Sequence, residues 1–546
     1  MPWGRAQRLR RWLAAVVLVA WCGPRVAGAE CVGDCNGDGR VVIAELIIGV
    51  NIALGTVAVT QCRPFDANSD GRVAVNEVIV AVANGLAECP LQRPFPELVS
   101  ITLAGAAAGD DSTYPALSDD GRFVVFVSRS ADLAPNTSGT HAEVYVRDTC
   151  LGTPPASCTP STSLVSAQQG SDTEGDADAG VLPAVSADGR FVAFASRATN
   201  LVEGVTAGKS QIYLRDTCRS ATAVLPDCMT RTTILSVDAD GQPGSTDSFR
   251  PSISADGRLV AFESFAVLNP SDQNSTEDIY LRDTLRDTAT HATVVVSVNV
   301  DAVGPVSSQD ASISGDGRFV AFVALSGDPV ESVAYVRDTC GVPSAPVAGC
   351  TAATTLVSGD PDGNAVTGLK PSVNGDGRFV AFHSDAPSLN PTGPSTHPNN
   401  VYVRDTCSGA PAGCRPSTTF ASLDGNDDHR GNGDSERASI SADGRFVAFA
   451  SLADNLAPDS NGETEDVFLR DTCLGPQAPP ACVGSTVLLS TNSDGQQGTQ
   501  GSMRPALSRD GTFAAFESDA ENLVAIPNQM HTQVYLTPNP IAAPAP

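Results

Sequence analysis

The chain has 546 residues, which is long enough for one large hydrophobic core or several smaller ones. Its formal net charge of −28 argues against binding to nucleic acid or to anionic membranes, and it suits calcium. With 49 Gly, 38 Pro and only 5% aromatic residues, the composition favours many short strands and turns over long helices.

Residues 1–29 have the pattern of a signal peptide. Met1–Arg11 carries four arginines, an apolar run extends from Trp12 to Trp21, and Ala27-Gly28-Ala29 offers a cleavage site before Glu30. The apolar run is too short to span a bilayer, which needs about 20 residues, although an uncleaved anchor is the alternative. No other apolar stretch is long enough for a membrane helix. We therefore predict a secreted protein, whether extracellular, at the cell surface or periplasmic.

Residues 30–90 form the next predicted unit, a small calcium-binding domain. Residues 34–45 (DCNGDGRVVIAE) and 66–77 (DANSDGRVAVNE) both match the EF-hand loop pattern D-x-[DN]-x-[DN]-G-x5-E in full. Calcium prefers about six to eight oxygen ligands, which such a loop supplies from side chains, one backbone carbonyl and a bidentate glutamate. The predicted ligands of two Ca²⁺ ions are Asp34, Asn36, Asp38, the Arg40 carbonyl and Glu45, and then Asp66, Asn68, Asp70, the Arg72 carbonyl and Glu77.

A helical pattern follows each of these loops, at Glu45–Leu54 and Glu77–Leu86. Two loops that each lead into a helix resemble the dockerin family, over about residues 31–89. The resemblance implies docking onto a cohesin-like partner. The chain departs from the family pattern in two ways. Its loops end in Glu where dockerin loops usually end in Asp, and the usual Ser/Thr recognition pair is replaced by Ile43-Ala44 and Val75-Asn76.

After a linker at residues 91–97, one segment recurs seven times. The copies are PALSDDGRFVVFVS from Pro115, PAVSADGRFVAFAS from Pro183, PSISADGRLVAFES from Pro251, ASISGDGRFVAFVA from Ala311, PSVNGDGRFVAFHS from Pro371, ASISADGRFVAFAS from Ala438 and PALSRDGTFAAFES from Pro505. Asp and Gly tolerate the positive φ that a tight hairpin requires, so each Asp-Gly pair predicts a turn between two strands.

The second copy illustrates the strands predicted for every repeat. They are Pro183–Ser186, then Phe191–Phe194, which is apolar on both faces, then Ile212–Leu214 and Thr232–Ser236. Four strands repeated radially make the blades of a β-propeller. Because a lone blade leaves both faces unburied, the repeats must pack against one another.

The two ends of the repeat region predict how the ring closes. The last copy stops after its third strand, Val534–Leu536, and the missing fourth strand stands before the first copy, at Leu98–Thr102. A β-helix or a sandwich does not explain this arrangement. The predicted fold is therefore mostly β: a seven-bladed β-propeller at residues 98–538, a small α-helical EF-hand/dockerin-like domain before it, and a disordered tail at 539–546.

The repeats resemble those of TolB-like (WD40-like) propellers, whose blades carry SxDGRxxAFxS and IYVxD signatures, over roughly residues 98–537. Members of that family act as protein-binding modules, and related blades form the gating domain of prolyl oligopeptidases. The chain has no G-x-S-x-G nucleophile elbow, so the peptidase activity does not come with the resemblance.

The cysteines predict a disulfide framework. Of 15 cysteines, Cys22 lies in the signal segment, which leaves an even number in an exported protein. Zinc is the alternative, but the spacing is not CxxC. Cys31, Cys35, Cys62 and Cys89 allow three pairings, which stay open. The close pairs, each bridging one short loop, are Cys150/Cys158, Cys218/Cys228, Cys340/Cys350, Cys407/Cys414 and Cys473/Cys482.

Catalytic residues are not evident in the repeats. The six histidines are scattered, and His383 replaces a small residue after Phe382. The Arg-Asp pair that ends the third strand recurs in six repeats, which indicates a structural role. A ligand site is expected at the mouth of the central channel or on the face with the long acidic loops, which are Ser171–Ala179, Asp238–Asp247, Asp424–Glu436 and Asp459–Asp466.

We therefore expect a secreted calcium-binding protein whose propeller is a non-catalytic platform for a protein or another ligand. The expected partners are a cohesin-like or other extracellular protein, or a glycan. The alternative is a dockerin-bearing extracellular enzyme, a hydrolase or lyase that degrades polysaccharide with carboxylates on the acidic face.

Overall fold

The computed structural model describes residues 35, 43–65, 72–74, 78, 81–82 and 95–542, with gaps at 152–153, 155–157, 206–207, 220–227, 273, 275, 285–292, 299–306, 327–330, 342–346, 390–398, 412, 425–428 and 458–463. The chain divides into two compact units, Met1–Pro94 and Phe95–Pro546. Within the described ranges, no helix has both the length and the apolar character needed to cross a membrane.

The first unit contains helix α1 (Ile43–Ala53) and the short 3₁₀ helices η1 (Val59–Gln61) and η2 (Arg63–Phe65). Helix α1 begins two residues before the predicted start. The Phe65 ring packs so closely on α1 that a Cβ at Gly49 would lie 2.1 Å from it. A disulfide joins Cys35 to Cys62, one of the pairings that the sequence left open. The small core of this unit therefore combines one helix, one aromatic ring and one disulfide.

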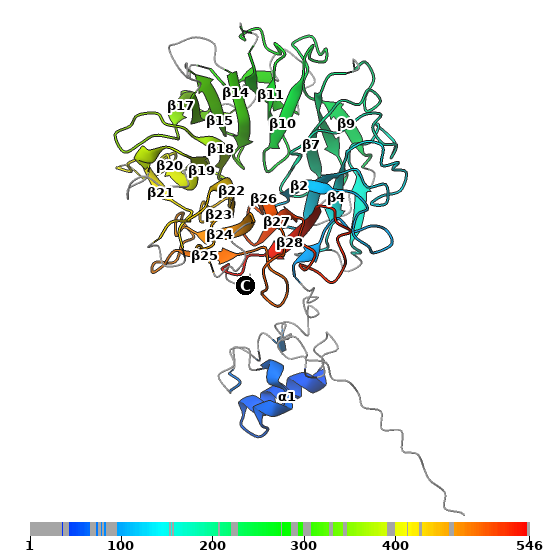
Figure 1. Ribbon diagram of the computed structural model, residues 1–546, viewed down its shortest axis with the longest axis vertical. Coiled ribbons are helices and arrows are strands. Elements are labelled where there is room, and N and C mark those ends of the chain that lie inside the picture. Colours follow the sequence, from blue (N-terminus) through cyan, green and yellow to red (C-terminus); the bar gives the residue numbers. More distant parts are fainter. Residues whose placement is uncertain are drawn as a thin grey trace, which may run out of the picture. The chain divides into compact units, whose positions relative to one another are not determined.

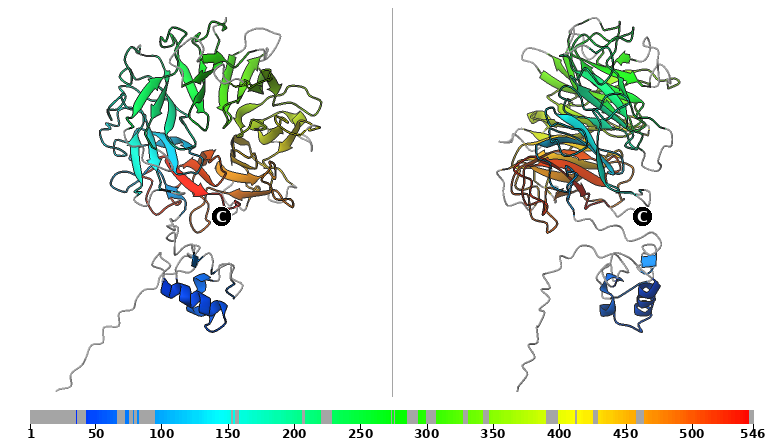
Figure 2. Two further views of the ribbon diagram at one scale, coloured as in Figure 1. Left: turned by 180° about the vertical axis from the view of Figure 1, so that it is seen from behind. Right: turned by 90° about the vertical axis from the view of Figure 1, so that its right-hand side faces the viewer.

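The second unit is a ring of seven four-stranded antiparallel sheets, and so a seven-bladed propeller (Figure 1). Figure 2 shows the same ring from behind and from its side. Blades 1 to 3 consist of β2 (Ser112–Leu117), β3 (Phe123–Ser128), β4 (Glu143–Asp148) and β5 (Ser161–Leu164); β6 (Ala184–Val185), β7 (Phe191–Ser196), β8 (Gln211–Asp216) and β9 (Arg231–Ile234); and β10 (Ser248–Ile253), β11 (Leu259–Ser264), β12 (Asp278–Asp283) and β13 (Thr293–Val295).

The remaining blades follow the same strand order. Blades 4 and 5 are β14 (Ser307–Ile313), β15 (Phe319–Ser326), β16 (Glu331–Asp338) and β17 (Ala353–Leu356); and β18 (Leu369–Val373), β19 (Phe379–Ser384), β20 (Asn400–Asp405) and β21 (Ser417–Phe420), with η4 (Pro387–Leu389) between β19 and β20. Blades 6 and 7 are β22 (Ser435–Ile440), β23 (Phe446–Ser451), β24 (Asp466–Asp471) and β25 (Ser485–Leu488); and β26 (Ser502–Leu507), β27 (Phe513–Ser518), β28 (Gln533–Pro538) and β1 (Glu97–Leu98).

Blade 7 closes the ring with strands from both ends of the propeller segment, as predicted. Leu98 of β1 is paired with Tyr535 of β28, and the Val99 N–H donates to the Val534 carbonyl over 2.8 Å. The closing strand is shorter than the predicted Leu98–Thr102. It ends because the Ile101 N–H turns back to the Val99 carbonyl, which starts a tight turn.

Neighbouring blades interlock through the glycine of each Asp-Gly turn. Gly189 of blade 2 has φ +75°, and a Cβ placed there would lie 2.1 Å from the Phe123 ring of blade 1. The same contact joins blade 7 to blade 1, where Gly121 meets Phe513. Glycine is therefore required at these positions for two reasons: it adopts the positive φ readily, and it has no side chain to clash with the ring of the neighbouring blade.

A buried polar residue begins most third strands and bonds to a serine beside the fourth strand. In blade 2, Ser236 donates to the Gln211 side chain over 2.5 Å. In blade 1 the residue is Glu143, whose carboxylate accepts a hydrogen bond from Ser166. Burial raises the pKa of Glu143 to about 8, and the hydrogen bond from Ser166 only partly opposes this shift.

We expect Glu143→Gln to stabilise the protein in a pH-dependent way. The pKa of Glu143 is higher in the folded than in the unfolded protein. Its contribution to the free energy of unfolding is therefore fully present below about pH 4.5 and is lost as the pH rises towards 8. The slope is at most about 1.4 kcal/mol per pH unit. Urea unfolding of both proteins at pH 5 and pH 8 should show a gain that is much larger at pH 8. An equal difference at both pH values would contradict the assignment.

Candidate functional site on the inner strands

In six of the seven blades, the Asp-Gly turn is linked to the end of the third strand by one repeated set of bonds. In blade 2, the Arg190 Nε and Nη2 donate to the two carboxylate oxygens of Asp216 over 2.9 and 2.7 Å. The Arg190 guanidinium lies 4.7 Å from the centroid of the Phe191 ring, and Asp216 also accepts the Cys218 N–H. The predicted structural role of the Arg-Asp aspartate is thus supported, but its main partner is the arginine of Asp-Gly-Arg.

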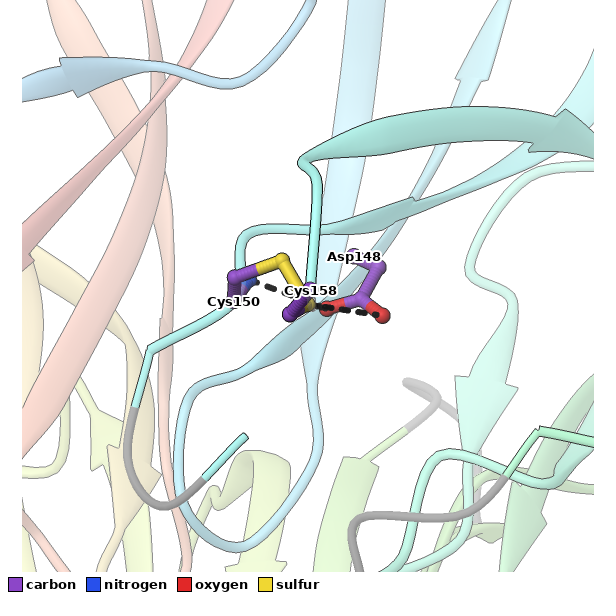
Figure 3. A group of neighbouring side chains, drawn as sticks. All are labelled: Asp148, Cys150 and Cys158. Carbon is purple, nitrogen blue, oxygen red and sulfur yellow. Dashed lines mark hydrogen bonds between the residues drawn. A yellow bond between two sulfur atoms is a disulfide. The ribbon is translucent and has the colours of Figure 1, made fainter. Parts of the chain in front are cut away.

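The predicted disulfides of the cysteine-closed loops lie beside these ion pairs. The carboxylates and sulfur atoms gather closely enough to suggest metal ligands, as at Asp148, Cys150 and Cys158 (Figure 3). However, a metal requires a thiolate, whereas these sulfurs form a disulfide, and both Asp148 oxygens already accept from Arg122. We therefore assign a structural role to all five such groups, which contain the disulfides Cys150–Cys158, Cys218–Cys228, Cys340–Cys350, Cys407–Cys414 and Cys473–Cys482.

Backbone hydrogen bonds encircle the axis of the ring at the end formed by the Asp-Gly turns. One bond joins each pair of neighbouring blades: Asp119 to Ala187, Ala187 to Ala255, Ala255 to Gly315, Asp316 to Gly375, Gly375 to Ala442, Ala442 to Arg509, and Asp510 to Asp119, written from N–H to carbonyl.

The Arg509 side chain crosses the axis at this same end. It starts from blade 7, donates to the Ile253 carbonyl of blade 3 over 3.0 Å, and forms an ion pair with Asp119 of blade 1 at 3.3 Å. A Cβ at Gly315 of blade 4 would lie 2.6 Å from its Nη1. Arg509 therefore occupies the centre of the ring at the Asp-Gly end.

The first strand of each blade lies nearest the axis. It carries one residue in the left-handed conformation in six blades, and in blade 2 this residue, Leu182, lies just before β6. In most blades this residue falls where the pairing of the first and second strands shifts register, as between Phe249 and Ser252. Such a bulge redirects a side chain out of the regular alternation. The seven residues, each with φ between 46° and 60°, are Tyr114, Leu182, Arg250, Asp310, Lys370, Arg437 and Arg504.

Five of these positions, in blades 3 to 7, are charged, and each forms an ion pair. The pairs interact with one another electrostatically and so form one network. Arg250 forms an ion pair with Glu263 at 3.0 Å, and Asp310 forms one with Lys370 at 2.5 Å. Arg504 is paired with Glu517. We call this network the inner charged arc, and its members are Arg250, Glu263, Asp310, Lys370, His383, Glu436, Arg437, Arg504 and Glu517.

Burial separates the two signs of charge within the inner charged arc. The side chains of Arg250, Lys370, Arg437 and Arg504 are between 27% and 44% exposed, whereas those of Glu263, Asp310 and Glu517 are at most 5% exposed. Solvent therefore meets the cations, and most of the carboxylates lie beneath them. The arc has as many cations as carboxylates, so it is neutral in formal charge within a protein of formal charge −28, and its exposed side chains are mostly cationic.

Burial also changes the titration of the arc. It raises the pKa of Glu263, even though the Arg250 guanidinium opposes the shift, and it raises the pKa of Glu517. Burial lowers the pKa of His383 to about 4, so this imidazole is neutral at neutral pH. Neither Glu263 and Glu517 nor the His383 imidazole is therefore placed as an exposed acid or base.

Most of the residues predicted to bind calcium lie outside the described part of the chain. These are Asp34, Asn36, Asp38 and Arg40 of the first loop, and Asp66, Asn68, Asp70 and Glu77 of the second. Glu45 is described, and its carboxylate accepts the Cys35 N–H over 2.9 Å. Arg72 is described as well. The two calcium sites therefore remain predictions.

Carboxylates of the loops between blades hold their own turns in the two places where the pattern is clearest. Asp238 Oδ1 accepts the N–H groups of Asp240 and Gln242, each over 2.9 Å. Asp360 accepts those of Asp362 and Asn364 in the same manner. In these two loops the carboxylates bind the backbone of their own turn, which favours solvated turns over a ligand site there.

The inner charged arc was mostly missed by sequence reasoning, which singled out only His383. A signal was present in the repeat itself. The residue that precedes the Pro or Ala at the start of each copy is, in chain order, Tyr, Leu, Arg, Asp, Lys, Arg and Arg, while the residues after it are nearly constant. A position that varies between otherwise nearly identical repeats is one where the packing of the blade does not require a particular side chain.

Comparison with known proteins gave only distant similarity. No family model and no curated protein matches the chain. Among solved structures, TolB from Acinetobacter baumannii is 14% identical, with 66% of this chain and 79% of that chain covered and a TM-score of 0.30. The propeller domain of the Trilobed protease from Pyrococcus furiosus is 12% identical, with 75% and 90% covered and a TM-score of 0.41.

Prolyl oligopeptidase B from Galerina marginata is also 12% identical, with 80% of this chain and 52% of that chain covered and a TM-score of 0.42. At these identities the similarity concerns the propeller fold alone.

Proposed function

We propose that the chain is a secreted, non-catalytic binding protein whose ligand contacts the inner charged arc of the propeller. The observation that carries this proposal is the layering of charge, with exposed cations above buried carboxylates. A general acid or base must reach its substrate, but Glu263 and His383 are almost completely buried. Such an arrangement suits recognition better than proton transfer.

We also propose that the N-terminal unit binds two Ca²⁺ ions and docks the propeller onto a cohesin-like or other extracellular protein, or onto a glycan. Two complete loop patterns support this proposal. The Glu45 carboxylate already faces the backbone of the first loop at Cys35. The Cys35–Cys62 disulfide connects this loop to the segment just before the second one. Bound calcium would stabilise this small unit by neutralising its clustered carboxylates.

Calcium titration of the full oxidised chain by calorimetry should show two saturable sites. We expect Asp34→Ala to remove one site, Asp66→Ala to remove the other, and the double variant to lose both. The carboxylate in the first loop position is a direct ligand, so its loss removes charge and coordination together. Asp240→Ala, in an exposed propeller turn, is the matched control and should keep both sites. A double variant that still binds two ions would refute the calcium assignment.

The binding role of the propeller is tested on arrays of immobilised peptides and glycans, with a turnover assay for each ligand that binds. Binding without any product is expected. Release of reducing ends from a polysaccharide, or cleavage of a peptide, would instead establish an enzyme and contradict the proposal.

A further inference from the structure

The chemical class of the ligand can be inferred from the inner charged arc, and this inference rests on the proposed binding role. A guanidinium offers five N–H donors, and an ammonium offers three. In the arc, the Arg250 Nη1 donates to Glu263, and the Lys370 ammonium donates to Asp310. Both side chains are also more than a third exposed, so some of their N–H donors remain available to an anion from solvent.

We propose that the inner charged arc binds the carboxylate groups of an acidic peptide segment, an exposed loop or chain end of a partner protein. Four cations from blades 3, 5, 6 and 7 point to an extended ligand with several carboxylates rather than to a single small anion. Charge-assisted hydrogen bonds of this kind are the strong ones in proteins, and arginine forms them in bidentate geometry with carboxylates.

Two buried polar atoms of the arc support a ligand at this place. Within the described residues, His383 Nδ1 and Asp310 Oδ2 lack hydrogen-bond partners. Both residues are more than nine-tenths buried, and His383 lies on β19 within the electrostatic reach of Lys370, Glu436 and Arg437. Because a buried polar atom is costly when unpaired, an arriving N–H or O–H donor would find an acceptor there.

The rest of the inner circle favours a peptide over an acidic polysaccharide. Leu182 occupies the equivalent position in blade 2 and is 39% exposed, so an aliphatic contact lies on the same circle as the cations. The Tyr114 ring, the one aromatic ring at these seven positions, is covered by the Arg504 guanidinium 4.5 Å from its centroid. Arg509 obstructs the far end of the axis, which suits an inserted loop or chain end better than a long polymer that threads through.

The test uses the full oxidised protein and a fluorescein-labelled hexaglutamate peptide, with binding followed by fluorescence anisotropy. Lys370→Ala and Arg437→Ala remove exposed cations. Arg250 and Arg504 are kept because they are the ion-pair partners of the buried Glu263 and Glu517, whereas the buried Asp310 still has Arg250 at 3.7 Å when Lys370 is removed. We expect each substitution to weaken binding about tenfold, and the double variant about a hundredfold. Lys370→Arg should retain binding. Arg129→Ala, which removes an exposed cation from the outer loop after β3, should bind like the wild type.

Thermal unfolding of each variant shows whether it is folded, and Lys370→Arg keeps the test valid if the alanine variants are unstable. The inference is overturned if hexaglutamate does not bind, if Arg129→Ala weakens it as much as Lys370→Ala, or if oligogalacturonate binds at the arc and the peptide does not. If array ligands bind equally well to the Lys370→Ala/Arg437→Ala variant, the binding role stands and the proposed ligand class fails. If no array ligand binds the wild type, the binding role itself fails.

Discussion

Gly189→Ala should destabilise the propeller by about 2–5 kcal/mol, the sum of two separate costs. The backbone of Gly189 has φ +75°, where an L-residue costs about 1–2 kcal/mol. The new methyl group would lie 2.1 Å from Phe123 of the preceding blade, and overpacking of this kind costs about 1–3 kcal/mol or more. The Phe123 ring has little room to move, because the Arg122 guanidinium lies 4.8 Å from its centroid.

The chain provides a matched control for this substitution in Gly241. Its φ of +79° is nearly the same, but no atom lies within 4 Å of the position that a Cβ would take. Gly241→Ala should therefore show the conformational cost alone, about 1–2 kcal/mol. Urea unfolding of both variants separates the two costs by subtraction. Equal losses would mean that the contact between blades contributes nothing.

This comparison also shows why sequence reasoning succeeded for the fold. The Asp-Gly turn, the apolar second strand and the cysteine-closed loop each lie within a few residues. The first two patterns recur seven times and the third five times, which makes each of them easy to recognise. Ring closure followed because the fourth strand of blade 7 had to come from Leu98, at the other end of the segment. In contrast, the double role of Gly189 depends on Phe123, which the pattern does not connect to it.

The candidate site was harder to predict because its geometry depends on residues far apart in sequence. Arg250 reaches Asp310 in the next blade, and a bulge with positive φ, rather than regular alternation, directs its side chain. Arg509 reaches Ile253 over 256 positions. The periodicity of a strand would assign such side chains to a blade face, so the inner charged arc becomes visible only when the ring is assembled. The calcium loops differ from the arc, because each motif is complete within twelve consecutive residues and can be read from the sequence alone. Calcium titration is the test of that prediction.

Arg445→Ala should cost about 3–5 kcal/mol, because it leaves a buried carboxylate without its cation. Asp471 is 2% exposed, and it accepts from Arg445 Nε and Nη2 over 3.1 and 2.7 Å. The matched control is Arg129→Ala, which breaks the ion pair with Asp178, where both side chains are nearly half exposed. Solvent screens that pair, so its loss should cost about 1 kcal/mol or less. Urea unfolding with the disulfides intact measures both.

The double variant Arg445→Ala/Asp471→Ala decides whether the loss arises from the stranded charge or from lost packing. If the uncompensated carboxylate is the cause, removal of Asp471 as well should recover part of the stability, despite the loss of the Cys473 N–H acceptor. If lost packing of the Arg445 guanidinium on Phe446 is the cause, the double variant should be no more stable than the single one. Because the same Arg–Asp pair recurs in six blades, recovery would mean that each pair holds its turn through charge compensation. In that case the arginine and the aspartate stabilise the blade only as a pair, and replacing one of them alone lowers the free energy of unfolding more than replacing both.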